Sequence, residues 1–135
     1  MSAADRTGVQ ALVIDDSRAM RSILRRVLVD LGFEVFEAGN GQEALDHVAE
    51  HGAPDLALVD WNMPVMDGLQ FIVELRSQQE FRGVTLMMVT TESEHGQIVR
   101  ALAAGAHDYL IKPFLPEAFV EKLDLLGLTR RRVDA

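Results

Sequence analysis

Five polar side chains of this sequence have the types needed for chemistry on a phosphoryl group, and all follow short apolar runs: Asp15, Asp16, Asp60, Thr90 and Lys112. Three carboxylates brought within a few ångströms repel one another and stay ionised at neutral pH only if a cation joins them. Because the candidate ligands are all oxygens, a hard ion such as Mg²⁺ fits better than zinc, which would favour Cys or His. A carboxylate beside Mg²⁺, facing a lysine and a hydroxyl, can attack phosphorus in line, so Asp60 is the candidate nucleophile.

Each of these residues also has an ordinary structural explanation when it is taken alone. Asp15 or Asp16 can simply cap a helix. Thr90 can be a strand-end hydroxyl, and Lys112 can be a solvated charge. If the fold brings these residues together, the chemical interpretation is favoured. The strands and helices that carry them therefore have to be identified.

Short aliphatic or β-branched runs alternate with helix-period segments along the chain, a pattern typical of a parallel sheet with crossover helices on both faces. The expected strands are residues 9–14, 34–38, 56–59, 84–89 and 109–111. The sequence therefore predicts the α/β class, with (βα) repeated five times in a doubly wound parallel sheet. Right-handed crossovers bring all carboxyl ends of parallel strands to one edge, where ligands bind at the reversal of strand order. With the order 2-1-3-4-5, the polar residues converge at that edge.

The expected helices are amphipathic. In the first helix the apolar residues recur at helical spacing and precede a stop at Gly32; they are Met20, Ile23, Leu24, Val27, Leu28 and Leu31. The fourth helix carries Ile98, Val99 and Leu102 and stops at Gly105. Pro116 suits the first turn of the last helix, although Leu115 before it is not a capping residue.

Composition narrows the possible partners. The chain has 135 residues, 48% of them hydrophobic, so we expect a single domain over 1–135 with its core at 9–128 and frayed ends at 1–8 and 129–135. The net charge of −8 opposes binding to nucleic acid or anionic membranes, and the basic run Arg130, Arg131 and Arg132 is expected to be a solvated helix end. With no cysteine and no apolar run near the roughly 20 residues of a membrane span, we expect a soluble, cytoplasmic protein.

The four histidines fall on expected helices or loops away from the polar edge of the sheet: His47, His51, His95 and His107. Solvated surface side chains are the expected explanation of each.

The sequence resembles the receiver domains of bacterial response regulators, and more closely the stand-alone chemotaxis regulators among them. The resemblance covers residues 9–128 and rests on five separated motifs in the family's order. These are Asp15-Asp16, Asp60 followed by Trp61-Asn62-Met63-Pro64, Asp67-Gly68, Thr90, and Tyr109 before Lys112-Pro113. It implies a flavodoxin-like fold and a phosphorylation-controlled binding module that is not an enzyme beyond its own phosphotransfer and dephosphorylation.

The resemblance implies a metal site and a phosphoacceptor. Asp16, Asp60 and the main-chain carbonyl of Asn62 would bind Mg²⁺, with Asp15 acting through a water. Asp60 would accept the phosphoryl group from a sensor histidine kinase. Trp61 is expected to be a partly exposed ring beside the site, which could report binding by its fluorescence.

The resemblance also implies a switch. Thr90 and Lys112 would hold the phosphoryl oxygens, and Thr90 would move toward the phosphoryl group while Tyr109 turns inward behind it. The face built from the fourth helix, fifth strand and fifth helix would then change its affinity for a downstream protein. Asn62 and Glu92 occupy positions that tune hydrolysis of the phosphoaspartate, in a combination like the fast, chemotaxis type. An ordinary half-buried strand aromatic is the other explanation of Tyr109.

Three alternatives stay open at this point. A non-chemotactic regulator, such as a phosphorelay intermediate or a phosphate sink, would share every site residue. A magnesium-dependent phosphohydrolase with an aspartyl-phosphate intermediate would typically have Asp-x-Asp and a capping insertion, whereas the first strand here ends in adjacent Asp15-Asp16. A nucleotide-binding domain would need a glycine-rich loop after the first strand, where this chain has Asp-Asp-Ser-Arg.

Overall fold

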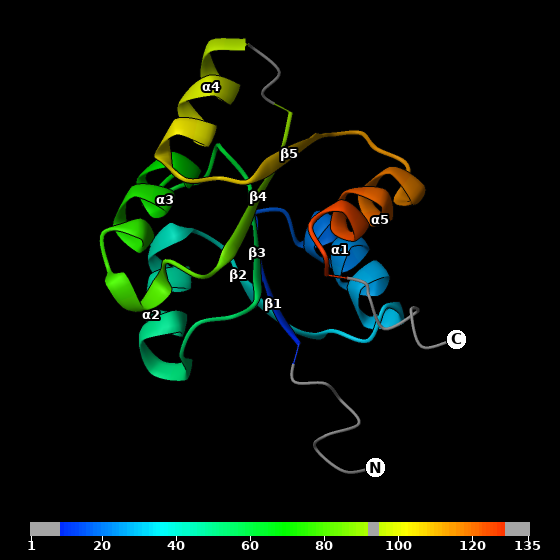
Figure 1. Ribbon diagram of the computed structural model, residues 1–135, viewed down its shortest axis with the longest axis horizontal. Helices are drawn as coiled ribbons and strands as arrows, with labels where there is room; N and C mark the ends of the chain where they lie inside the picture. The colour runs from blue at the N-terminus through cyan, green and yellow to red at the C-terminus, as the bar shows by residue number, and fades with distance from the viewer. Residues whose placement is uncertain (1–8, 92–94, 129–135) are drawn as a thin grey trace.

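Five parallel strands form one sheet in the order β2-β1-β3-β4-β5, as the sequence predicts (Figure 1). The computed structural model describes residues 9–91 and 95–128. The strands are β1 (Gln10–Ile14), β2 (Glu34–Ala38), β3 (Leu56–Val59), β4 (Thr85–Thr90) and β5 (Asp108–Ile111). Every neighbouring pair is parallel, so the carboxyl ends share one edge of the sheet. The strand order reverses between β1 and β3, which places Asp15 and Asp60 at the reversal point.

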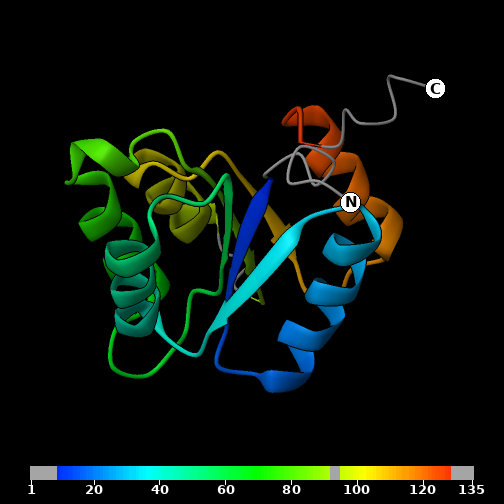
Figure 2. The same cartoon turned by 90° about the horizontal axis from the view of Figure 1, so that it is seen from below.

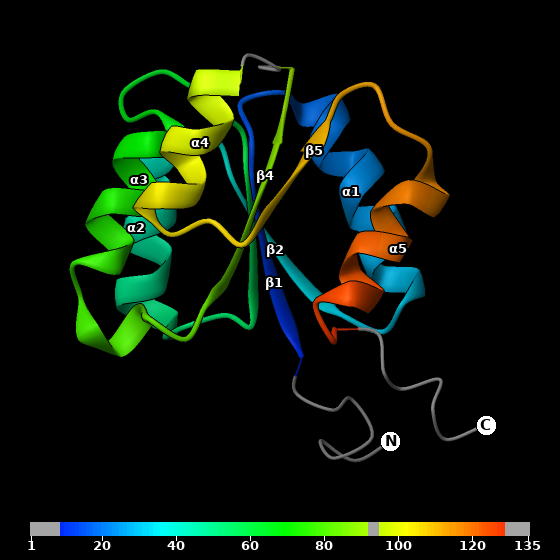
Figure 3. The same cartoon turned by 45° about the horizontal axis from the view of Figure 1, so that its top comes forward.

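Helices cover both faces of the sheet. They are α1 (Arg18–Asp30), α2 (Gly41–His51), α3 (Gly68–Arg76), α4 (His95–Ala104) and α5 (Pro116–Leu125), with a short 3₁₀ helix η2 (Gln79–Phe81) after α3. Helices α2, α3 and α4 lie on one face, and α1 and α5 lie on the other (Figure 2, Figure 3). Alternate residues of each strand point into two hydrophobic cores, one on each face of the sheet. Leu12 and Ile14 belong to the core under α2, α3 and α4, and Ala11 and Val13 belong to the core under α1 and α5. Because both faces are covered, β3 is wholly apolar, and β1 and β4 have polar residues only at their ends.

The helix ends follow the local signals of the sequence. Ser17 caps α1, and its hydroxyl accepts the N–H of Met20 at 3.1 Å. Gly105 ends α4 with a φ of 126°, a conformation that side chains other than hydrogen rarely allow. Leu115 occupies the N-cap position before α5 without a side-chain hydrogen bond, and Pro116 lies in the first turn, as the sequence indicates.

Two helices bury fewer apolar residues than the sequence predicts. Leu24 and Leu28 of α1 are buried, but Ile23 is 48% exposed. In α4 only Ala101 is buried, whereas Val99 and Leu102 remain exposed. Periodicity marks the apolar side of a helix, but the breadth of the covered part depends on which neighbours pack against it.

No helix within the described ranges has the length and apolar character needed to cross a bilayer. Several predictions fall on residues outside these ranges: those for Glu92, for the arginines at 130–132 and for the frayed ends at 1–8 and 129–135.

Candidate functional site

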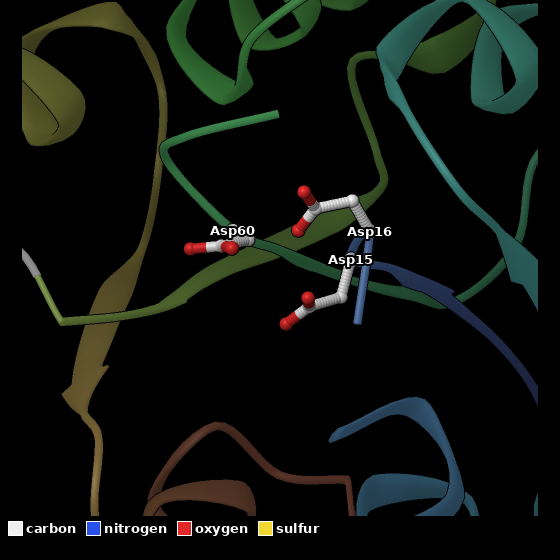
Figure 4. A group of neighbouring side chains, drawn as sticks. All are labelled: Asp15, Asp16 and Asp60. Atoms are coloured by element: carbon white, nitrogen blue, oxygen red, sulfur yellow. The ribbon is translucent and has the colours of Figure 1, made fainter. Parts of the chain in front are cut away.

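Three carboxylates meet at the carboxyl ends of β1 and β3 (Figure 4). One oxygen of each of Asp15, Asp16 and Asp60 lies within 4.8 Å of the others. Asp15 and Asp60 are buried, with 1% and 8% of their surface exposed, and Asp16 is exposed. The convergence that the sequence predicts for these acids is therefore present in the fold.

Lys112, directly after β5, supplies positive charge to this acid cluster. Its Nζ lies 3.0 Å from Asp15 Oδ2 and 3.6 Å from Asp60 Oδ2. Burial is the largest influence on Asp60 and raises the pKa of its carboxyl, Lys112 opposes that rise, and Asp15 adds to it. The net result is a pKa above the ordinary value, because the ammonium of Lys112 does not offset burial and the charge of Asp15.

Backbone amides fix the orientation of the two buried acids. The N–H of Ser17 donates to Asp15 Oδ1 at 2.8 Å, and the N–H of Trp61 donates to Asp60 Oδ1 at 2.8 Å. The hydroxyl of Thr90, the last residue of β4, also donates to the Asp60 carboxylate. Asp60 is thus held by the main chain on one oxygen and faces Lys112 with the other.

The Asp67-Gly68 motif shapes the loop that follows Asp60. Asp67 caps α3 through a capping box with Gln70. A Cβ on Gly68 would lie 2.2 Å from the main-chain oxygen of Asp60, so only glycine allows α3 to start this close to β3. Between them Val65 has a φ of 71°, which is strained for a β-branched residue. The loop is therefore built tightly against the candidate phosphoacceptor.

The remaining predicted residues lie in the loop after β3 and on β5. Asn62 is exposed in the loop two residues after Asp60. Tyr109 is half-buried on β5, and the Lys112-Pro113 peptide bond that follows β5 is cis. The backbone N–H of Lys112 donates to the carbonyl of Thr90 at 2.9 Å, which links the ends of β4 and β5.

Trp61 differs from its prediction. The residue is buried, with 8% of its surface exposed, and it packs in the core beneath α4 with the guanidinium carbon of Arg100 5.9 Å from its ring centroid. The alternation of side chains after a strand does not reveal this, because the ring is covered by a helix distant in sequence. Its position next to Asp60 still makes it a usable fluorescence reporter.

Three of the histidines make specific contacts and are not simply solvated. His47 stacks on His51 with 4.3 Å between ring centroids and contacts Phe36, and burial lowers the pKa of His47. His107 accepts the N–H of Leu86 through Nδ1 at 3.1 Å. None of these rings belongs to the acid cluster.

The chemistry of this donor set fits Mg²⁺. Three carboxylates with a single ammonium between two of them leave surplus negative charge, and the grouped ligand atoms are all oxygens. A hard divalent cation held by carboxylates and phosphate meets both conditions. Asp15, Asp16 and Asp60 are the residues able to hold it.

Comparisons with known proteins agree with this fold and give the family of the chain. The family model described as the response regulator receiver domain matches residues 11–124. The chain is 38% identical over 119 residues to the chemotaxis protein CheY1 of Helicobacter pylori. The aligned region covers 87% of this chain and 96% of that protein. It is 39% identical over 121 residues to the CheY homolog of Campylobacter jejuni, spanning 88% and 93% respectively.

A solved structure gives the same result for the fold. The chemotaxis response regulator CheY4 of Vibrio cholerae superposes with a TM-score of 0.80 at 35% identity, covering 87% of this chain and 97% of that one. Proteins of this kind are two-component signalling proteins and not classical enzymes. The chain belongs to the response regulator receiver domain family.

Proposed function

We propose that residues 9–128 act as one receiver unit, a phosphorylation-activated switch in which Asp60 accepts a phosphoryl group from a sensor histidine kinase. The observation that carries this proposal is the placement of Asp60: its side chain is 11% exposed, grouped with two acids and 3.6 Å from a lysine ammonium. A buried acid with a raised pKa in such a cluster is a functional-site signature.

The transfer step uses the residues at the strand ends. An Asp60 carboxylate oxygen attacks the phosphorus of a phosphohistidine; the new P–O bond forms as the P–N bond breaks, and the leaving imidazole takes up a proton. Bound Mg²⁺ would neutralise charge on the phosphoryl oxygens. Lys112 and Thr90 hold those oxygens from the opposite side, which is supported by their contacts to Asp60 in the structure.

Hydrolysis of the phosphoaspartate restores the Asp60 carboxylate and does not need a second protein. A water attacks phosphorus, the P–O bond to Asp60 breaks, and inorganic phosphate leaves. Asn62 and Glu92 would tune the rate of this step, with Asn62 also offering its main-chain carbonyl to the metal. The exposed position of Asn62 beside Asp60 is compatible with this role.

The output would be a change in affinity for a downstream protein at the α4-β5-α5 face. Among the helices that would form this face, α4 has Val99 and Leu102 47% and 40% exposed, and Leu115 just before α5 is 70% exposed. Exposed apolar side chains of this kind favour protein contacts. We place the switch in control of chemotaxis or motility, in the cytoplasm, because the relatives reported above carry chemotaxis names.

Phosphorylation of Asp60 is tested by incubating the chain with Mg²⁺ and ³²P-labelled acetyl phosphate. We expect acid-stable, base-labile label in the wild type and none in Asp60→Asn, because the amide cannot act as the nucleophile. Asp46→Asn, which changes an exposed acid of α2, is the matched control and should be labelled like the wild type. Stoichiometric labelling of Asp60→Asn would disprove the proposal.

A further inference from the structure

Tyr109 is held toward α5 by a charged pair. The Lys122 ammonium of α5 lies 4.9 Å from the Tyr109 ring centroid, within the range of a cation–π interaction. The same ammonium lies 3.0 Å from Asp108 Oδ1, and that oxygen also accepts the backbone N–H of Tyr109 at 2.7 Å. Asp108 therefore positions the cation over the ring.

On the other side Tyr109 borders a small apolar cavity of about 10 Å³ between β4, β5 and α4, which Gln97 and Ile98 of α4 also line. The side-chain Oε1 of Gln97 is buried and has no hydrogen-bond partner among the described residues. A buried amide without a partner is costly, so a donor that reaches it is favoured.

The Tyr109 hydroxyl is the side-chain group best suited to Gln97. The other hydroxyl that lines the cavity, that of Thr90, already donates to Asp60. A phenol can donate to the amide oxygen or accept from the amide N–H, so it suits either orientation of the amide group. Because the cavity is smaller than a ring, Tyr109 enters it only when α4 yields, and the new hydrogen bond favours that movement.

We propose that Gln97 is the positioning residue that receives the Tyr109 hydroxyl when the ring turns inward, and that the Asp108–Lys122 pair holds the ring toward α5. The balance between these two contacts sets the ratio of the two ring positions. The inward position of the ring rests on the proposed function, in which phosphorylation of Asp60 turns Tyr109 inward. The position toward α5 does not depend on phosphorylation, because it is the one found in the unmodified protein.

The sequence contains one tyrosine, so incorporated 3-fluorotyrosine gives a single ¹⁹F resonance that reports Tyr109. Its shift measures the ratio of the two positions, and proton contacts of the ring to Lys122 or Ile98 assign them. The proteins are the wild type, Gln97→Leu, Lys122→Met and Lys122→Arg, each with Mg²⁺ and then with added beryllium fluoride as a phosphoryl mimic. Labelling by acetyl phosphate is measured on every variant.

In the unmodified state we expect Lys122→Met to move the ratio inward roughly twofold to fivefold, and Lys122→Arg to keep the wild-type ratio because the cation remains. With beryllium fluoride the wild type should move inward, and Gln97→Leu should reduce that movement roughly threefold to tenfold, the value of one hydrogen bond. Labelling of Asp60 should be retained in all of these proteins.

Each part can fail separately. An unchanged resonance in Lys122→Met overturns the role of the charged pair whether or not Asp60 is phosphorylated. If Asp60 is labelled but Gln97→Leu responds to beryllium fluoride like the wild type, or changes only Trp61 emission, the role of Gln97 is overturned and the proposed function stands. If the wild type takes no label, the proposed function fails, and the unmodified state still tests Lys122.

Discussion

The two lysines of this chain form ion pairs of equal length in different surroundings. Lys112 lies 3.0 Å from Asp15, with side chains 12% and 2% exposed, and Lys122 lies 3.0 Å from Asp108, with side chains 29% and 25% exposed. A buried pair leaves a costly charge behind when one partner is removed, whereas a solvated pair exchanges for water at little cost. The comparison indicates that the Lys112 ammonium is held in place beside the buried acids, whereas the Lys122 ammonium can leave Asp108 for water at little cost.

Lys112→Met should have the largest effect on stability. It keeps the aliphatic stem but removes the ammonium beside the buried carboxylates of Asp15 and Asp60. We expect a loss of about 3 kcal/mol in the free energy of unfolding at neutral pH without divalent cation. Urea denaturation measures it, and Mg²⁺ should recover part of the loss; an unchanged midpoint would contradict the interpretation that the Lys112 ammonium is held in place.

Gly68→Ala tests whether the main chain fixes the site. Its Cβ would meet the Asp60 carbonyl oxygen at 2.2 Å, and backbone atoms cannot give way as a flexible side chain can. We expect a loss of about 2 to 3 kcal/mol in stability together with slower labelling of Asp60. Gly83→Ala is the matched control, because nothing lies within 4 Å of its added carbon. Equal urea midpoints for the two variants would refute this explanation.

The pH dependence of the stability of Asp60→Asn tests whether the ionised carboxylate of Asp60 destabilises the fold. Burial raises the folded-state pKa of Asp60, so its stability contribution is present at low pH and is lost as the pH rises through that pKa. Without divalent cation the variant should melt a few degrees higher than the wild type at neutral pH. The difference should vanish below the ordinary aspartate pKa of about 3.9. Calorimetry measures the two melting temperatures. If their difference does not change with pH, the ionised carboxylate of Asp60 does not destabilise the fold.

Lys122→Met should have the smallest effect on stability, below about 0.5 kcal/mol, because its pair with Asp108 is partly solvated. The same urea titration as for Lys112→Met makes the comparison direct. Similar losses for the two variants would show that the two pairs are not different in kind.

The order of elements and the grouping of the acids could be predicted from the sequence. Apolar runs ending in Asp15, Asp60 and Thr90 define strands, and parallel strands joined by right-handed crossovers must bring their ends to one edge. The strand ranges agree with the structure to within one residue at each end. These properties depend on local patterns and on chain connectivity, which a sequence contains.

Other features depend on which surfaces meet in three dimensions, and only the tertiary structure decided them. The sequence predicted a partly exposed Trp61, but α4 covers it, and the apolar residues Ile23 and Val99 of the predicted amphipathic helices remain about half exposed. The same holds for Gly68, whose need for glycine comes from the carbonyl of Asp60. The contacts around Tyr109 join residues of β5, α4 and α5, and their positions follow from the packing of whole helices on the sheet.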